Sequence, residues 1–409
     1  MTTPAGAAAF VAEANGVDHQ QVMRQAVNAV AEARGLPAPW PASLPGTLAS
    51  RLTKRLADLG DDLATWGGRE LGALREELLS SHERSTSGTW YTPPEVARPL
   101  TEAALSTITD HLYLDDDPTH LLNTSALDPA CGAGVFLIAA ARFLAGAYAG
   151  MLYGTHHPAP LTVQAVLPEV MRTCIFGIDT DPVAVDLAKS VCWLECAGTP
   201  SIHWLDDNIA TGNALDGDLP PALADRLHQG PLAVVGNPPY KDKAKGCAPW
   251  IEARRPGPRT ARTPDELYRP SLDEFRVPGQ GNVEKSLSNL YIYFWRWALW
   301  RVCETRLQPG CIAFLTPSAW LASPTFAGMR RELRRAADQG LVIDLTPEGL
   351  QPPITTRLFP GVSIPLCAAI FTRRAGPNPN EPAHVRHATV HGSRADKVQR
   401  IEELLRLSP

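Results

Sequence analysis

The chain has 409 residues and a formal net charge of −5, with 44% hydrophobic and 20% charged residues. This is the composition of an ordinary soluble protein, long enough for one catalytic domain with an appendage. The charge excludes a uniformly basic surface for nucleic acid, although it leaves room for a basic cleft. We expect that no apolar stretch is long enough to cross a bilayer, and no basic region before an apolar core marks a secretory signal, so we expect a cytoplasmic protein without a membrane partner. The eight cysteines include no Cys-x-x-Cys pair, so no metal site is expected.

Residues 1–80 are predicted to form an N-terminal helical region. Hydrophobic residues recur with helical spacing over 18–34 and over 48–59, on either side of a Pro-rich linker. A further helix is predicted over 67–80.

The apolar stretch around residues 121–127 predicts a buried strand, and residues 135–141 predict a helix. A Gly-rich turn, Asp128-Pro129-Ala130-Cys131-Gly132-Ala133-Gly134, joins the two. Glycines at 132 and 134 allow the backbone to approach a ligand closely, because no Cβ stands in the way. The turn has neither the Gly-Lys-Ser/Thr of a phosphate loop nor the Gly-x-Gly-x-x-Gly of a dinucleotide site. This pattern favours a nucleoside without phosphate, and hence S-adenosylmethionine over NAD or ATP.

The next predicted strand, residues 174–179, ends in an acid, Asp179. A carboxylate at this place can accept hydrogen bonds from both hydroxyls of a ribose. Asp181-Pro182 then opens a helix predicted over 183–192.

The apolar run over 232–236 predicts another buried strand, which ends in the turn Asn237-Pro238-Pro239-Tyr240. The turn places an amide, a proline carbonyl and an aromatic ring at the carboxyl end of a strand, where α/β sheets bind their ligands. The amide oxygen and the carbonyl can accept both protons of an exocyclic amine while the ring stacks on the planar group that carries it. We therefore predict a site for a planar amino group such as N6 of adenine.

Strands and helices alternate over 81–240, which predicts a parallel, doubly wound α/β sheet as the cofactor-binding core. Residues 241–285 are rich in Pro, Gly and charge, and we expect an insertion that is mobile without DNA. Residues 286–409 are expected to complete the core with strands over 311–315, 341–345 and 366–371. The insertion carries the basic cluster that we expect to bind DNA phosphates: Arg254, Arg255, Arg259 and Arg262.

These motifs, in this order, resemble those of the gamma-type DNA adenine-N6 methyltransferases, and they are similar to the large restriction-modification and phage-defence enzymes. The resemblance covers roughly residues 68–405 and rests on the pairing of Gly88-Thr89-Trp90-Tyr91-Thr92-Pro93-Pro94 with the downstream Asn237-Pro238-Pro239-Tyr240. It implies a Rossmann-like S-adenosylmethionine-dependent methyltransferase sheet. The catalytic residues that it implies are Asn237, Pro238, Pro239 and Tyr240. The cofactor-binding residues that it implies are Tyr91, Thr92, Pro93, Asp128, Pro129, Ala130, Gly132, Gly134, Asp179, Thr180, Asn213 and Ala214, with Asn213 standing where the family usually has Asp.

The resemblance implies a site-specific DNA methyltransferase that moves a methyl group from S-adenosylmethionine to N6 of adenine in restriction-modification or phage defence. A target-recognition region follows this segment in the similar enzymes, so we expect a separate specificity subunit or a longer chain to supply it. Three alternatives stay open: an amino methyltransferase for RNA bases or protein glutamine, a cytosine-N4 enzyme, and a non-catalytic DNA-binding subunit.

Overall fold

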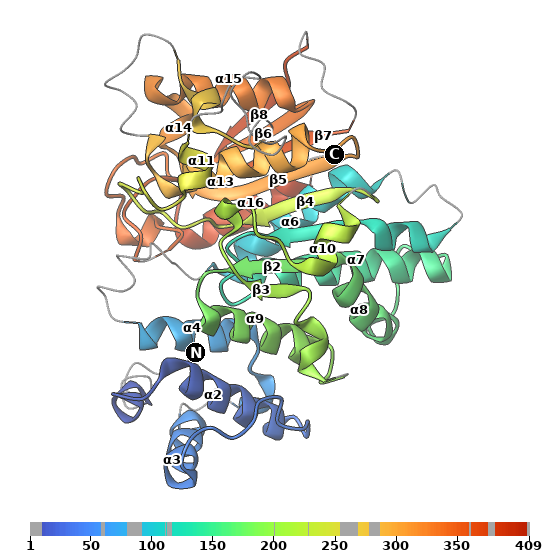
Figure 1. Cartoon of the computed structure of the whole chain (residues 1–409), viewed down its shortest axis with the longest axis vertical. Coiled ribbons are helices and arrows are strands. Elements are labelled where there is room, and N and C mark those ends of the chain that lie inside the picture. Colours follow the sequence, from blue (N-terminus) through green and yellow to red (C-terminus); the bar gives the residue numbers. More distant parts are fainter. Residues whose placement is uncertain are drawn as a thin grey trace.

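The fold is built around one mixed sheet of eight strands in the order β3-β2-β1-β4-β5-β7-β6-β8 (Figure 1). The computed structural model describes residues 10–58, 62–79, 92–110, 112, 117–199, 201–227, 229–253, 269–277, 287–359, 361–374 and 381–406. The strands are β1 (Ser125–Asp128), β2 (Ile175–Asp179), β3 (Ile209–Thr211), β4 (Leu232–Gly236), β5 (Gly310–Pro317), β6 (Gln339–Asp344), β7 (Leu366–Arg373) and β8 (His384–Thr389).

The first half of the sheet is parallel, as the sequence predicts. β1 lies between β2 and β4, and both of its pairings are parallel. β7 is the exception in the second half, because it runs antiparallel to both β5 and β6. The parallel strands therefore end at a common edge, and the Rossmann-like methyltransferase fold that was predicted is confirmed.

Helices cover both faces of the sheet. The alternation of side chains along a strand sends Ala233 and Val235 of β4 into one hydrophobic cluster and Leu232 and Val234 into another. The helices that contribute to the first cluster include α6 (Pro94–Thr109), α7 (Val135–Tyr153), α8 (Pro160–Cys174), α9 (Pro182–Glu195) and α16 (Arg394–Arg406). The second cluster includes residues of α10 (Pro221–Arg226), α11 (Pro249–Glu252), α13 (Leu290–Leu299), α14 (Ala319–Ala322) and α15 (Ala327–Ala336).

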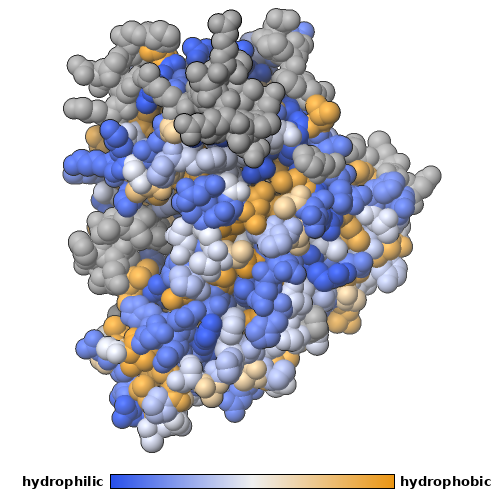
Figure 2. Space-filling view, viewed as in Figure 1, coloured by the Kyte–Doolittle hydropathy of each residue, from blue (hydrophilic) through white to orange (hydrophobic). Residues whose placement is uncertain are grey.

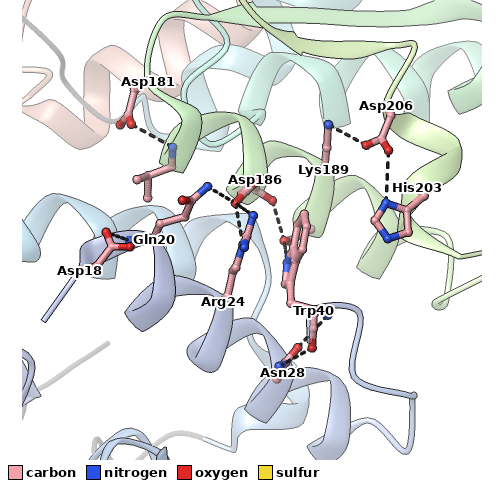
Figure 3. A network of polar contacts seen from close by, with 12 residues as sticks. Asp18, Gln20, Arg24, Asn28, Trp40, Asp181, Asp186, Lys189, His203 and Asp206 are labelled. Carbon is pink, nitrogen blue, oxygen red and sulfur yellow. Dashed lines mark hydrogen bonds and ion pairs between the residues drawn. The ribbon is translucent and has the colours of Figure 1, made fainter. Parts of the chain in front are cut away.

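The N-terminal helices are α2 (His19–Ala33), α3 (Gly46–Ala57) and α4 (Gly68–Leu78), in agreement with the helices predicted there. α2 and α4 contact α9, and α3 packs on α2. Arg24 and Gln20 of α2 both reach the same carboxylate oxygen of Asp186, each at 2.7 Å (Figure 3). The indole nitrogen of Trp40 donates a hydrogen bond of 2.8 Å to Ser190 Oγ, also on α9. The N-terminal region therefore packs on the helix that follows Asp179.

One segment differs from the expectations. The strand predicted over 121–127 begins only at Ser125, because Pro118–Asn123 forms the 3-10 helix η3, whose start is capped by Asp117. The described parts of 241–285 contain α11 and the 3-10 helix η6 (Leu272–Phe275), and their Ile251 and Phe275 side chains are buried. Residues 254–268 and 278–286 lie outside the described residues.

The expectation that no apolar stretch is long enough to span a bilayer was wrong for α7, which passes that test by length and composition. In the fold, α7 lies between other elements and contacts α6, α8, α9 and the strands β1 and β2. Figure 2 shows a face of the molecule on which hydrophilic side chains predominate, with apolar side chains gathered near its centre. The position of α7 is that of a core helix beside the sheet.

Candidate active site

A cavity of about 490 Å³ lies at the edge of the sheet where β1, β2 and β4 end. Most of the residues predicted from the sequence meet around it. Those that line it are Thr92, Asp128, Pro129, Ala130, Gly132, Asp179, Thr180, Asn213, Ala214, Asn237 and Pro239.

Other predicted residues do not line this cavity. Pro93, Gly134, Pro238 and Tyr240 lie near it in sequence but are not part of its wall. The remaining predicted residues, Tyr91, Arg254, Arg255, Arg259 and Arg262, lie outside the described residues.

The Gly-rich turn has the backbone conformation that requires glycine. Gly132 and Gly134 have φ angles of +51° and +80°. A Cβ at Gly134 would lie 3.3 Å from the Cα of Ala188, so the absence of a side chain also lets α9 approach closely. The Gly132 amide donates a hydrogen bond of 2.9 Å to Asp179 Oδ2, which joins the turn after β1 to the acid that ends β2.

Two carboxyl groups at the floor of the cavity have perturbed acidity. Burial raises the pKa of Asp128 to about 8, the backbone hydrogen bond from Ala130 opposes this rise, and the nearby Asp179 carboxylate adds to it. Burial also raises the pKa of Asp179, although backbone hydrogen bonds from Asp181 and Gly132 work in the opposite direction. Both acids are therefore poised for a cationic or hydrogen-bond-donating ligand, which would favour their charged forms.

The side chain of Asn237 is held by residues from distant parts of the chain. Its Nδ2 donates a hydrogen bond of 2.9 Å to Oγ1 of Thr92, a residue that is only 4% exposed. The Tyr240 hydroxyl donates to Asn237 Oδ1 and also lies 3.4 Å from the carbonyl oxygen of Leu315. Because an amide oxygen has two lone pairs, Oδ1 can still accept one more hydrogen bond.

The Tyr240 ring packs against the hydrophobic core, and burial raises the pKa of its hydroxyl well above the usual range. The carbonyl of Pro238 receives no hydrogen bond from the residues that the structure describes. Two acceptors, Asn237 Oδ1 and the Pro238 oxygen, thus follow each other in one turn.

The two turns touch. A Cβ at Gly236 would lie 2.7 Å from Asp128 Oδ1, which is closer than real Cβ contacts. Glycine before Asn237 therefore lets the end of β4 pass directly beside the Asp128 carboxyl. The Gly-rich turn after β1 and the Asn237 turn after β4 therefore form one continuous site.

Sequence reasoning missed one wall of the cavity. Helix α4, from the N-terminal region, lines it with Gly72, Arg75 and Glu76, and Leu79 follows them. The Arg75 guanidinium pairs with Asp181 at 2.9 Å. Amphipathic spacing predicts that α4 is a helix, but it does not indicate that α4 lies against the ends of β1, β2 and β4. The wall is completed by Lys241, Cys247, Leu290 and Phe294, which follow the Asn237 turn.

The cavity fits a nucleoside joined to an amino acid. Its volume lies in the range of small-molecule sites. The Asp179 carboxylate and the open Gly132 turn suit a ribose, and the apolar lining suits a purine ring. In the described part of the chain, no group of three or more His, Cys, Asp or Glu side chains could hold a metal ion.

The strand order, the reversed β7 and a nucleoside-sized cavity at the strand ends define the class of Rossmann-like methyltransferases. Residues 69–254 match the model of the N-6 DNA methylase family. The match covers less than half of the chain, and it contains both the Gly-rich turn and Asn237-Pro238-Pro239-Tyr240.

Solved structures with the same fold include restriction-modification enzymes. The DrdV–DNA complex is similar with a TM-score of 0.60 and 16% identity, over 97% of this chain and 41% of that one. The ATP-dependent Type ISP restriction-modification enzyme LlaBIII bound to DNA is similar with a TM-score of 0.58 and 13% identity, over 98% of this chain and 28% of that one. The chain thus spans less than half the length of either of these two chains. A comparison with curated proteins gave no significant match.

Proposed function

We propose that the chain transfers a methyl group from S-adenosylmethionine to N6 of adenine in DNA. The observation that carries this proposal is the position of Asn237, whose amide is held by Thr92 at the rim of the cavity that contains Asp128 and Asp179. The match of residues 69–254 to the model of the N-6 DNA methylase family supports the same reaction.

Thr92 sets the orientation of the Asn237 amide. Because Nδ2 donates to Thr92 Oγ1, Oδ1 is the atom left to accept a proton of the target amine. The Pro238 carbonyl accepts the second N–H bond, so the lone pair of N6 is drawn out of conjugation with the ring and would attack the methyl carbon. The bond from that carbon to sulfur would break, S-adenosylhomocysteine would leave, and the surplus proton on N6 would pass to solvent. In other enzymes, a preoriented hydrogen bond of this kind lowers the activation free energy by about 2.7–4 kcal/mol.

S-adenosylmethionine supplies a methyl group that is already electrophilic, so the chain needs no covalent nucleophile. Cys131 is buried in the Gly-rich turn, and burial raises the pKa of its thiol well above the usual range, which makes it a poor nucleophile. Asp179 would hold the ribose, and the turn at Gly132 would let the cofactor lie close to the backbone. The adenine enters the site unpaired or flipped out of the duplex.

We also propose that the chain acts in restriction-modification or phage defence, together with DNA and a specificity subunit or region. Restriction-modification enzymes are among the proteins of the same fold, and the LlaBIII and DrdV structures contain DNA. The cluster of Arg254, Arg255, Arg259 and Arg262 would contact phosphates, which position DNA without selecting its sequence.

Sequencing for modified bases, in cells with and without the chain, tests the proposal. We expect N6-methyladenine to depend on the chain. Modified cytosine in its place would make the enzyme a cytosine-N4 methyltransferase. Methyl transfer to ribosomal RNA or to total protein, but not to plasmid DNA, would overturn the choice of substrate.

A further inference from the structure

A strip of lysines directly follows the Asn237 turn. Lys241, Lys243 and Lys245 occupy alternate positions of the chain. Within the part of the chain that the structure describes, their ammonium groups form no hydrogen bond or ion pair. By contrast, Lys189 and Lys397 each pair with a carboxylate, at 2.7 and 2.9 Å. The lysine strip therefore has donors to offer an anionic ligand.

The backbone holds this strip in place against helix α13. The Leu290 amide donates a hydrogen bond of 2.9 Å to the Lys241 carbonyl, and the Asn289 side chain donates to Asp242. Lys243 has a φ of +56°, in the left-handed region that is unfavourable for residues other than glycine. Such a conformation persists only where the surrounding contacts impose it. The two hydrogen bonds thus fix where Lys241 lies relative to the Asn237 turn.

Lys241 is the member of the strip that lines the cavity. The same wall contains Cys247, an exposed residue, so this side of the cavity is open to solvent. The aspartates that line the cavity form no ion pair with Lys241, and they are Asp128, Asp179 and Asp181. Lys241 is therefore an unpaired cation on the open side of the cavity.

The chemistry of the proposed reaction indicates which anion this cation would bind. S-adenosylmethionine carries a positively charged sulfonium, so a second cation at the reacting atoms would be repelled. A base that leaves the duplex turns about its own backbone, and its flanking phosphates stay outside the pocket that receives the base. Such a phosphate would lie where the base enters, on the open side of the cavity that Lys241 lines.

We propose that Lys241 binds one of the two phosphates that flank the target adenosine, and so holds the extruded nucleotide with its amine at Asn237. The inference rests on the proposed function, and it adds a substrate-binding residue to the end of the Asn237 turn. A lysine suits this task because its ammonium acts on phosphate as a point charge. Lys243 and Lys245 do not line the cavity, so they would contact phosphates farther along the strand.

Binding of an oligothymidine strand with a single adenine tests the assignment, because its one target adenine is known and unpaired. In a matched series, one phosphate at a time is replaced by a neutral methylphosphonate. Affinities are measured by fluorescence anisotropy at low salt, with the full chain saturated with S-adenosylhomocysteine. For the wild type we expect a loss of about tenfold at one flanking phosphate, the size expected for a hydrogen bond to a charged group.

The Lys241→Gln variant should bind the unmodified strand about tenfold less tightly than the wild type. It should lose less than about twofold more when that flanking phosphate is neutralised, because the contact is already absent. The slope of log affinity against log salt should become shallower by about 0.7, the value for one phosphate contact with a single strand. Its affinity for S-adenosylhomocysteine, measured by calorimetry, should not change.

Two variants serve as controls. Lys241→Arg retains the charge, so it should keep most of the affinity and the sensitivity to the flanking phosphate. Lys245→Gln removes a neighbouring lysine that is exposed and lies outside the cavity wall. We expect this variant to keep the wild-type sensitivity to the flanking phosphate.

Additive losses from Lys241→Gln and from neutralising either flanking phosphate would overturn the inference, because the two groups would then act independently. A parallel loss of S-adenosylhomocysteine affinity in Lys241→Gln would also overturn it, since Lys241 would then bind the cofactor. If the wild-type chain bound the single-adenine strand no more tightly than plain oligothymidine, the proposed function itself would fail. That result is distinct from a failure of Lys241, in which binding depends on adenine but shows no coupling to the phosphate.

Discussion

Replacing Thr92 by Val tests how Asn237 is oriented. Valine keeps the shape of threonine but removes Oγ1, which accepts the 2.9 Å hydrogen bond from Asn237 Nδ2. Thr92 is only 4% exposed, so water cannot readily replace the lost acceptor. Leaving the buried Asn237 Nδ2 without an acceptor is unfavourable by about 1–3 kcal/mol. The amide can avoid this penalty by rotating, which would point its NH₂ group, instead of Oδ1, toward the target amine. Either outcome opposes the reaction, so we expect methyl transfer to slow by roughly 5- to 150-fold.

The assay is single-turnover transfer of a labelled methyl group to plasmid DNA at saturating cofactor, with cofactor affinity measured separately by calorimetry. Thr92→Ser is the matched control, because it retains the hydroxyl and should keep most of the rate. A wild-type rate for Thr92→Val would refute the orienting role. A loss that disappears at higher cofactor concentration would mean that Thr92 acts on the cofactor, as the family resemblance implies, and not on Asn237.

Three other changes probe the same site. Asp179→Ala should weaken S-adenosylmethionine binding at least about tenfold in calorimetry, since the acid is expected to hold both ribose hydroxyls. Unchanged affinity would contradict the assignment of Asp179 to the ribose. Tyr240→Phe should retain more methyl transfer than Tyr240→Ala, because the alanine variant also loses the ring, which packs against the core and which we propose to stack on the base at a gain of about 1–3 kcal/mol. Equal impairment would assign the role to the hydroxyl that donates to Asn237. Burial holds the pKa of Asp128 at about 8, above its ordinary 3.8, so the folded chain binds this proton more tightly than the unfolded chain. The resulting stabilisation is complete below about pH 4 and is lost as pH rises toward about 8. Urea unfolding of the cofactor-free protein across this range should therefore show a smaller decline for Asp128→Asn, and equal slopes would contradict the raised pKa.

Local sequence patterns sufficed where one segment determines its own structure. The run Leu232–Gly236 forms β4 with the bounds that its apolar residues and the following Asn-Pro-Pro predict. The turn after β1 needs glycine at 132 and 134, and both have the positive φ that the pattern implies. These features depend on backbone conformation and burial of neighbouring residues, which the sequence displays directly.

Features that depend on contacts between distant parts of the chain could not be predicted from the sequence. The Thr92–Asn237 hydrogen bond joins residues 145 positions apart, and nothing near either residue indicates their pairing. Strand β8 escaped prediction because it lies at the edge of the sheet, where most of its side chains are exposed and the apolar alternation is weak. The reversal of β7 likewise depends on its position between β5 and β6, not on its own residues.

The most direct test of the central claim is the chemistry of an Asn237→Ala variant. The wild-type chain and the variant would be incubated with S-adenosylmethionine and adenine-containing single-stranded DNA, and the nucleosides would be analysed by mass spectrometry, with cofactor affinity measured in parallel. We expect N6-methyladenine from the wild type only, while both proteins bind the cofactor equally well. Undiminished N6-methyladenine from the variant would show that the amine is bound elsewhere and would contradict the assignment of this turn.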